Sequence, residues 1–124
     1  GGEIQKQNRS AEEAKFWSTS YHVNGYAALI KMLKDNMTAT TFQKVKCPVF
    51  VGYYFKNEQE QDKVVSVPAI LKMYDSLGTS QNQKEKVAFT EVGNHVIACD
   101  IRSKDWESVY RETTLFLDKQ LVKK

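Results

Sequence analysis

Apolar residues in the first third of the chain recur at the spacing of a helix. The repeat comprises Tyr26, Leu29, Ile30, Leu33 and Met37. Intervals of three and four residues are typical of an amphipathic helix. Upstream, Ser10 and Glu13 form a capping box, in which two side chains bond the free amides at a helix start, so a short helix through Trp17 should follow. Residues 1–44 are therefore expected to be helical, with no strand among them.

The composition changes near residue 46. Residues 47–55 (CPVFVGYYF) are almost entirely apolar, which is typical of a strand covered on both faces of a parallel sheet. Ser66 and Pro68 mark the beginning of the next helix, and Gly78 marks its end. A second strand is predicted over residues 87–92. A last amphipathic helix is expected to begin near Ser103.

The order strand, helix, strand, helix predicts two parallel strands joined by a right-handed crossover. Two strands make a poor sheet, and the first is too hydrophobic for an open edge. We therefore expect further strands from an N-terminal portion that precedes these residues, in preference to strands from a second copy of the chain.

Composition narrows the function classes. Hydrophobic residues make up 41% and charged residues 27% of 124 residues, which is ordinary for a soluble globular protein. The net charge of +3 is scattered along the chain, so a nucleic-acid surface is not expected. No run approaches the roughly 20 apolar residues that span a bilayer. The compartment stays open, because any export signal would lie upstream.

Two cysteines, Cys47 and Cys99, adjoin a predicted strand or the loop after one. Small thiols at such positions are commonly buried, so two free core cysteines are expected. The alternative is a disulfide, which requires an oxidising compartment and Cα atoms within about 7 Å. The spacing of cysteines and histidines does not suggest zinc.

An acidic loop follows the first predicted strand, and His95 follows the second within the segment GNHVI. The carboxyl ends of parallel strands meet at one edge of a sheet, where active sites collect. There a neutral imidazole accepts a serine proton when a carboxylate holds its other nitrogen. The candidate acids are Glu58, Glu60 and Asp62. Asp62 is also close enough to the next helix to act as a carboxylate at its N-terminus.

These pieces resemble the C-terminal part of an α/β-hydrolase-fold protein. In that family an acid follows the penultimate strand, a G-x-H segment follows the last strand, and an amphipathic helix closes the domain. The matching segments are Gly52, residues 62–65 (DKVV), residues 93–95 (GNH) and residues 105–121. Asp62 is favoured as the acid because Lys-Val-Val after it best reproduces the family's pattern. The resemblance implies a helical cap-like segment over residues 1–45 and the strand-helix-strand-helix end of a three-layer α/β sheet over 46–124.

The resemblance also implies an activity. Asp62 and His95 would be the acid and base of a Ser-Asp-His triad that hydrolyses a small carboxylic ester or a peptide bond, with no metal or organic cofactor. The family's G-x-S-x-G nucleophile motif and its oxyanion segment are absent from the 124 residues. The chain alone is therefore expected to be inactive, with its serine on a missing N-terminal half. The alternative is a small non-catalytic α/β module that completes its sheet by self-association.

Three other features have simpler interpretations. His22 has no acid or nucleophile at a recognisable spacing, so a solvated or helix-capping histidine is expected. The aromatic residues Trp17, Tyr21 and Tyr26 would line the roof of a substrate pocket if residues 1–45 are a cap. Packing between helices is the favoured role for these rings.

Overall fold

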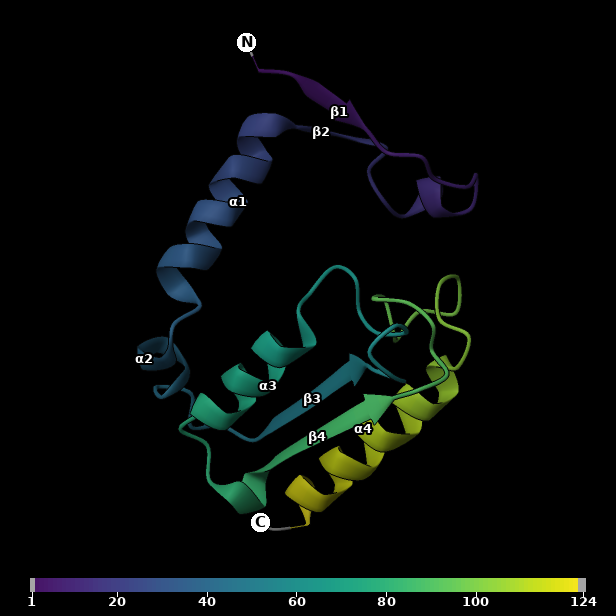
Figure 1. Cartoon of the computed structure of the whole chain (residues 1–124). Helices are drawn as coiled ribbons and strands as arrows, with labels where there is room; N and C mark the ends of the chain where they lie inside the picture. The colour runs from purple at the N-terminus through teal and green to yellow at the C-terminus, as the bar shows by residue number, and fades with distance from the viewer. Residues whose placement is uncertain (1, 123–124) are drawn as a thin grey trace. The chain divides into compact units, whose positions relative to one another are not determined.

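The computed structural model describes residues 2–122 and shows a mixed α/β protein with small sheets and four α-helices. The chain divides into unit 1 (Gly1–Thr38) and unit 2 (Ala39–Lys124). Unit 1 contains β1 (Ile4–Lys6), the 3-10 helix η1 (Glu13–Lys15), β2 (Ser20–His22) and α1 (Val23–Asn36). Unit 2 contains α2 (Ala39–Phe42), β3 (Val49–Tyr54), α3 (Val67–Ser76), η2 (Gln81–Gln83), β4 (Lys84–Phe89) and α4 (Trp106–Leu121) (Figure 1).

Unit 1 begins with a short antiparallel hairpin. β1 pairs with β2 in the register Ile4↔His22 to Lys6↔Ser20. The expectation that the first 44 residues hold no strand is therefore wrong, because strands of three residues are too short to show an alternating pattern. The capping box is confirmed, since the Ser10 amide donates to Glu13 Oε2 (2.8 Å) and the Glu13 amide donates to Ser10 Oγ (3.2 Å). The helix that it opens is only the 3-10 turn η1.

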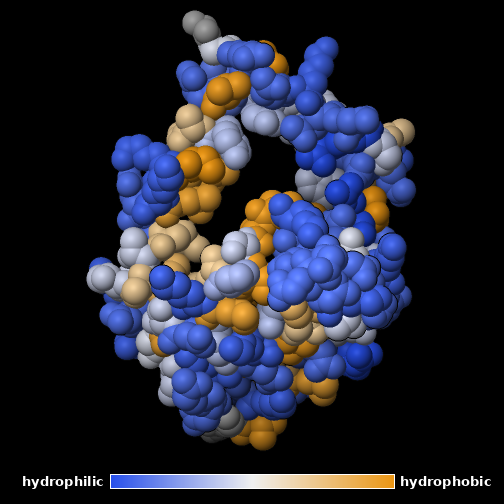
Figure 2. Space-filling model, viewed as in Figure 1, coloured by the Kyte–Doolittle hydropathy of each residue, from blue (hydrophilic) through white to orange (hydrophobic). Residues whose placement is uncertain are grey.

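His22 caps the helix α1, as expected. Its Nδ1 accepts a hydrogen bond from the Asn24 amide at 3.2 Å, which satisfies one of the free donors at the helix start. No residue of α1 is buried. Its apolar positions are left at the surface, with Leu29 45% exposed and Met37 56% exposed, and Figure 2 shows hydrophobic surface in orange and tan along α1.

In unit 2, β3 and β4 are parallel, as predicted, in the register Val49↔Lys84 to Tyr54↔Phe89. Side chains alternate between the faces of the strands. One face presents Phe50 to α4, where its ring lies 5.6 Å from that of Phe116. The buried core there consists of Tyr54, Phe89, Val92 and Val109, with Phe50, Val87 and Ile97 packed against it.

The opposite face of the two strands packs on α3. Lys84 and Lys86 each place Nζ 4.7 Å from the centroid of the Tyr74 ring. Lys84 is only 8% exposed, and its Nζ donates to the Tyr74 carbonyl oxygen at 3.0 Å. α3 and α4 therefore cover opposite faces of the sheet (Figure 1).

Several predicted boundaries are corrected. The second strand covers Lys84–Phe89 and not residues 87–92, because the ammonium groups of Lys84 and Lys86 lie over the Tyr74 ring and make the charged K-E-K segment part of the strand. The first strand is shorter than 47–55, covering Val49–Tyr54. α3 begins as expected, with Ser66 as its N-cap and a proline in its first turn. α4 begins at Trp106, because Asp105 and not Ser103 is its N-cap.

Both cysteines are free thiols, but neither is buried. Cys47 is exposed because it precedes the first residue of β3, and Cys99 is half-buried in the loop after β4. The prediction that both cysteines are free is confirmed, and the prediction that both are buried is wrong.

Within residues 2–122, no helix has the length and apolar character needed to cross a membrane.

Candidate active site

The loop after β3 returns to the strand and places Asp62 beside its end. Asn57 Oδ1 accepts from the amides of Gln59 (3.0 Å) and Glu60 (2.8 Å), which closes a tight turn. The Asp62 amide then donates to the Tyr54 carbonyl oxygen at 3.1 Å. A single antiparallel bridge, Phe55↔Gln61, adjoins this bond. Asp62 is therefore fixed to the strand itself and not only to the loop.

The Asp62 side chain is held by backbone amides. Its Oδ1 accepts from the amides of Val64 and Val65, both at 2.8 Å, and the side chain is only 4% exposed. The cap of α3 is Ser66, whose Oγ accepts from the Ala69 amide at 3.4 Å. The two carboxylate–amide bonds lie before the helix, so Asp62 does not cap it.

His95 sits on a tight loop after β4. Gly93 has φ +64°, a left-handed conformation that glycine adopts without steric cost. Next to it, Asn94 Oδ1 accepts from the Val96 amide at 2.9 Å, so the turn closes around His95. The base of the loop is anchored where the Lys104 amide donates to the carbonyl oxygen of the fully buried Val92 at 3.0 Å.

These two loops bring Asp62 and His95 together. Asp62 Oδ2 lies 2.6 Å from His95 Nδ1, a short distance typical of a charge-assisted hydrogen bond. The His95 side chain is 40% exposed, while its partner is buried. The imidazole is thus held at one nitrogen and open to solvent on the other side.

The electrostatics of the pair determine the tautomer. Burial raises the pKa of Asp62, but the His95 hydrogen bond, the Val65 and Val64 amides and the charge of His95 together outweigh it, so the net pKa is lowered. An ionised carboxylate only accepts hydrogen bonds, so His95 Nδ1 must be the donor. In the neutral ring Nε2 is then an acceptor, and no residue from 2 to 122 donates a hydrogen bond to it.

The other two candidate acids lie in the exposed part of the loop. Glu58 Oε2 accepts from Gln61 Nε2 at 3.5 Å, and Glu60 Oε2 accepts from Asn57 Nδ2 at 3.2 Å. Neither glutamate is hydrogen-bonded to His95. The structure thus joins Asp62 to the histidine and leaves Glu58 and Glu60 in the surface turn.

No hydroxyl or thiol in the described part of the chain is hydrogen-bonded to His95. Three serines of unit 2 have local structural partners instead. Ser66 caps α3, Ser76 Oγ donates to the Lys72 carbonyl oxygen at 2.8 Å, and Ser108 Oγ donates to Asp105 Oδ1 at 2.8 Å. Within residues 2–122, the site therefore pairs one carboxylate with one imidazole, and no hydroxyl or thiol joins them by a hydrogen bond.

The site also includes groups that sequence reasoning did not single out. The Val64 and Val65 amides position Asp62, and the Asn94 side chain positions the loop of His95. In the sequence, these groups were signalled only by the segments DKVV and GNH.

A small polar hollow of about 180 Å³ lies at the ends of the strands, between Lys56, Glu91 and Lys104. Within residues 2–122, no three His, Cys, Asp or Glu side chains gather as a metal site would require.

Comparisons with protein families, with curated proteins and with solved structures found no match to this chain.

Proposed function

We propose that this chain supplies the acid and the general base of a serine hydrolase. Asp62 orients His95, and His95 Nε2 takes the proton of a serine that lies outside these 124 residues. The observation that carries the proposal is the 2.6 Å hydrogen bond between a buried carboxylate and an exposed imidazole, at the carboxyl ends of adjacent parallel strands.

The chemistry follows from the charges of the pair. With Nδ1–H donated to Asp62, the lone pair of Nε2 faces outward as a proton acceptor. When Nε2 takes a proton from an attacking alcohol, the imidazolium lies against an anionic partner. The lowered pKa of Asp62 keeps that carboxylate ionised, so the proton stays on the ring until His95 gives it to the leaving group.

The proposed sheet is larger than two strands, and three-layered as in the α/β-hydrolase fold. Two observations support this. Backbone groups of a strand alternate between its edges, and the Phe55 amide bonds toward β4, to the Phe89 carbonyl oxygen. The backbone N–H and C=O groups of Gly52 and Phe50 therefore point to the other edge of β3. No strand from residues 2–122 pairs with that edge. The apolar face of α1 is also exposed, as expected of a cap-like segment over residues 1–45 that lies against other parts of the protein.

The substrate of the proposed enzyme is a small carboxylic ester or a peptide bond, and the reaction needs no metal or organic cofactor. The missing partner is an N-terminal half that carries the serine and the oxyanion donors. In enzymes of this chemistry, removing the histidine of the triad lowers turnover by about 10⁶-fold and neutralising its aspartate by about 10⁴-fold.

The test uses the protein extended upstream to include a G-x-S-x-G segment, with p-nitrophenyl acetate as substrate. His95→Ala should lower kcat by about 10⁶-fold. Asp62→Asn should lower it by about 10⁴-fold. Circular dichroism should stay unchanged in both variants. His22→Ala is the matched control, because His22 only caps α1, and it should keep wild-type turnover. Wild-type turnover in His95→Ala, or an upstream sequence without a nucleophile motif, contradicts the proposal.

The second candidate is a non-catalytic module that completes its sheet by self-association. The unpaired edge of β3 is the observation that favours it, since exposed edges readily pair with another copy. Sedimentation of the 124-residue chain separates the two functions. A stable dimer, together with a natural start near Gly1, favours the module.

A further inference from the structure

Unit 1 contains an open pocket of about 510 Å³, within the size range of small-molecule sites. It lies between the loops that flank β1 and β2 and the first turns of α1. Every residue that lines it belongs to unit 1. The lining residues are Gln7, Arg9, Trp17, Ser18, Ser20, Tyr21, Gly25, Tyr26 and Leu29.

Most of the side-chain surface of this pocket is apolar. Trp17, Tyr21 and Tyr26 contribute rings, and the Tyr21 and Tyr26 ring centroids lie 6.2 Å apart at an interplanar angle of 42°. Tyr21 is 41% exposed, so much of its ring is not covered by the chain. Aromatic rings held open in this way suit the flat or aliphatic body of a small molecule.

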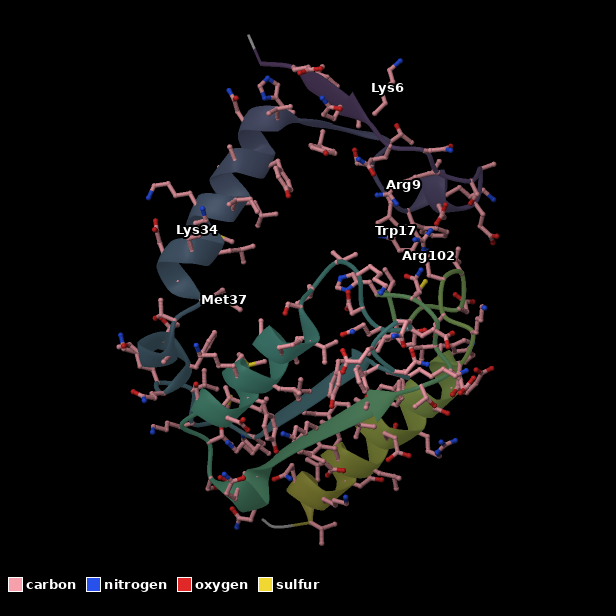
Figure 3. All side chains as sticks on the ribbon, viewed as in Figure 1. Lys6, Arg9, Trp17, Lys34, Met37 and Arg102 are labelled. Atoms are coloured by element: carbon pink, nitrogen blue, oxygen red, sulfur yellow. The ribbon has the colours of Figure 1, made fainter. Side chains whose placement is uncertain are left out.

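Arg9 is the charged side chain of the lining. Its Nε donates to the Ser18 carbonyl oxygen at 2.8 Å, which fixes the plane of the guanidinium. No carboxylate from residues 2–122 forms an ion pair with Arg9. Four of its five N–H donors, those of the two terminal nitrogens, therefore stay available for a planar anion. Figure 3 shows Arg9 and Trp17 close together in unit 1.

We propose that this pocket binds a small molecule with one carboxylate on an apolar body. The carboxylate pairs with the terminal nitrogens of Arg9, and the apolar part lies against Trp17 and the two tyrosines. This inference is independent of the proposed hydrolase, since it uses only unit 1. Bidentate arginine–carboxylate bonds supply the selectivity, and the rings supply most of the contact area.

Gly25 provides a way to fill the pocket without disturbing the fold. A Cβ added there meets no atom within 4 Å, and the residue lies in the first turn of α1. Gly25→Phe therefore places a ring in the hollow, and Gly25→Ala is its control. The alanine leaves the space open while making the same change of backbone freedom.

The measurement is the fluorescence of Trp17 in a Trp106→Phe background, in which it is the only tryptophan. The probes are 3-phenylpropionate and its neutral isostere 3-phenylpropionamide. We expect saturable binding of the anion, with the amide at least about 10-fold weaker, because a charge-assisted hydrogen bond is worth about a factor of ten over a neutral one. Gly25→Phe should weaken binding by more than about 10-fold, while Gly25→Ala keeps the wild-type affinity.

Arg9→Gln tests the charge directly and should make the affinities for the two probes equal. Circular dichroism checks that each variant is folded. The proposal is overturned if wild-type protein binds acid and amide equally, if neither probe saturates, or if Gly25→Phe binds as tightly as Gly25→Ala.

Discussion

Asp62→Asn removes one charge and leaves the shape of the side chain almost unchanged. Asp62 accepts one hydrogen bond of 2.6 Å from His95 and two of 2.8 Å from backbone amides. Bonds to a charged group are worth about 1.5–3 kcal/mol and neutral ones about 0.5–1.5 kcal/mol, so the two amide bonds lose roughly 1 kcal/mol each. The hydrogen bond to His95 is replaced by a neutral one and is weakened in the same way. Burying a neutral amide costs less than burying a carboxylate, and this offsets part of the loss from the three bonds. We expect a net loss of about 2 kcal/mol in the free energy of unfolding at pH 7.5.

The loss should depend on pH in a defined direction. The pKa of Asp62 is lower in the folded protein than in the unfolded chain, so the ionised carboxylate stabilises the fold above the unfolded value of about 3.9. That stabilisation disappears as the pH falls through the folded pKa. The difference between wild type and Asp62→Asn should therefore be full at pH 7.5 and smaller at pH 2. Urea unfolding followed by circular dichroism measures it at both values.

The same substitution should change the tautomer of His95. In the variant, the side-chain oxygen of the introduced asparagine stays with the Val64 and Val65 amides. Its NH₂ group therefore faces the ring, and His95 Nδ1 must become an acceptor. Long-range ¹H–¹⁵N spectra at pH 8.5 distinguish the two ring nitrogens. His22 is an internal reference, because its Nδ1 already accepts from the Asn24 amide and its proton must be on Nε2.

Two results would refute this reasoning. One is a wild-type spectrum in which His95 and His22 show the same tautomer. The other is an equal loss of stability at pH 7.5 and pH 2, which would mean that the charge of Asp62 plays no part. Asp75→Asn is the matched control: its side chain is 71% exposed and pairs with Lys86 at 3.7 Å, so it should cost no more than about 0.5 kcal/mol.

Further predictions concern packing. Gly78→Ala should destabilise unit 2 by roughly 1–3 kcal/mol in urea unfolding, because its Cβ would overlap the carbonyl oxygen of Gln43, and a neutral result would contradict that close approach. Phe116→Ala should cost about 3–5 kcal/mol, since the ring is 5% exposed and packs on Phe50. Leu117→Ala, next to it but 52% exposed, should cost under about 0.5 kcal/mol, and similar costs for the two would refute the assigned helix face. Gly25→Ala should stabilise α1 by about 0.5–1 kcal/mol, because alanine is the better helix former and its Cβ meets no other atom. Circular dichroism should show the gain as a higher helix content.

The sequence was most informative where several local signals agree. The apolar strand segment, the Ser66-x-Pro68 helix start and the GNH turn correctly predicted two parallel strands joined by a helix. The approach of Asp62 to His95 followed from the rule that carboxyl ends of parallel strands lie at one edge. The choice of Asp62 over the two glutamates rested on a family resemblance, because spacing alone leaves all three within reach.

Other features depend on partners that a pattern does not reveal. The β1–β2 hairpin consists of three-residue strands held by backbone bonds, and such short segments carry no periodicity. β4 begins at Lys84 because the Lys84 ammonium lies over the Tyr74 ring and donates to the Tyr74 carbonyl oxygen, whereas a hydropathy pattern assigns lysine to the surface. The exposure of Cys47 was missed because the strand begins two residues later than its apolar run.

The chain returns to β3 between Phe55 and Gln61, so the position of Asp62 does not depend on the length of the loop between these two residues. Asp62 is tied to the Tyr54 carbonyl oxygen, so the segment between them is a closed surface bulge rather than a tether. Closure entropy grows slowly with length, and doubling such a bulge costs only about 0.6 kcal/mol. Insertions between Glu58 and Gln59 should therefore leave the Asp62–His95 distance intact. Proteins built on this arrangement are free to vary that turn, and an affinity tag or fluorophore attached there would report on the site without displacing it.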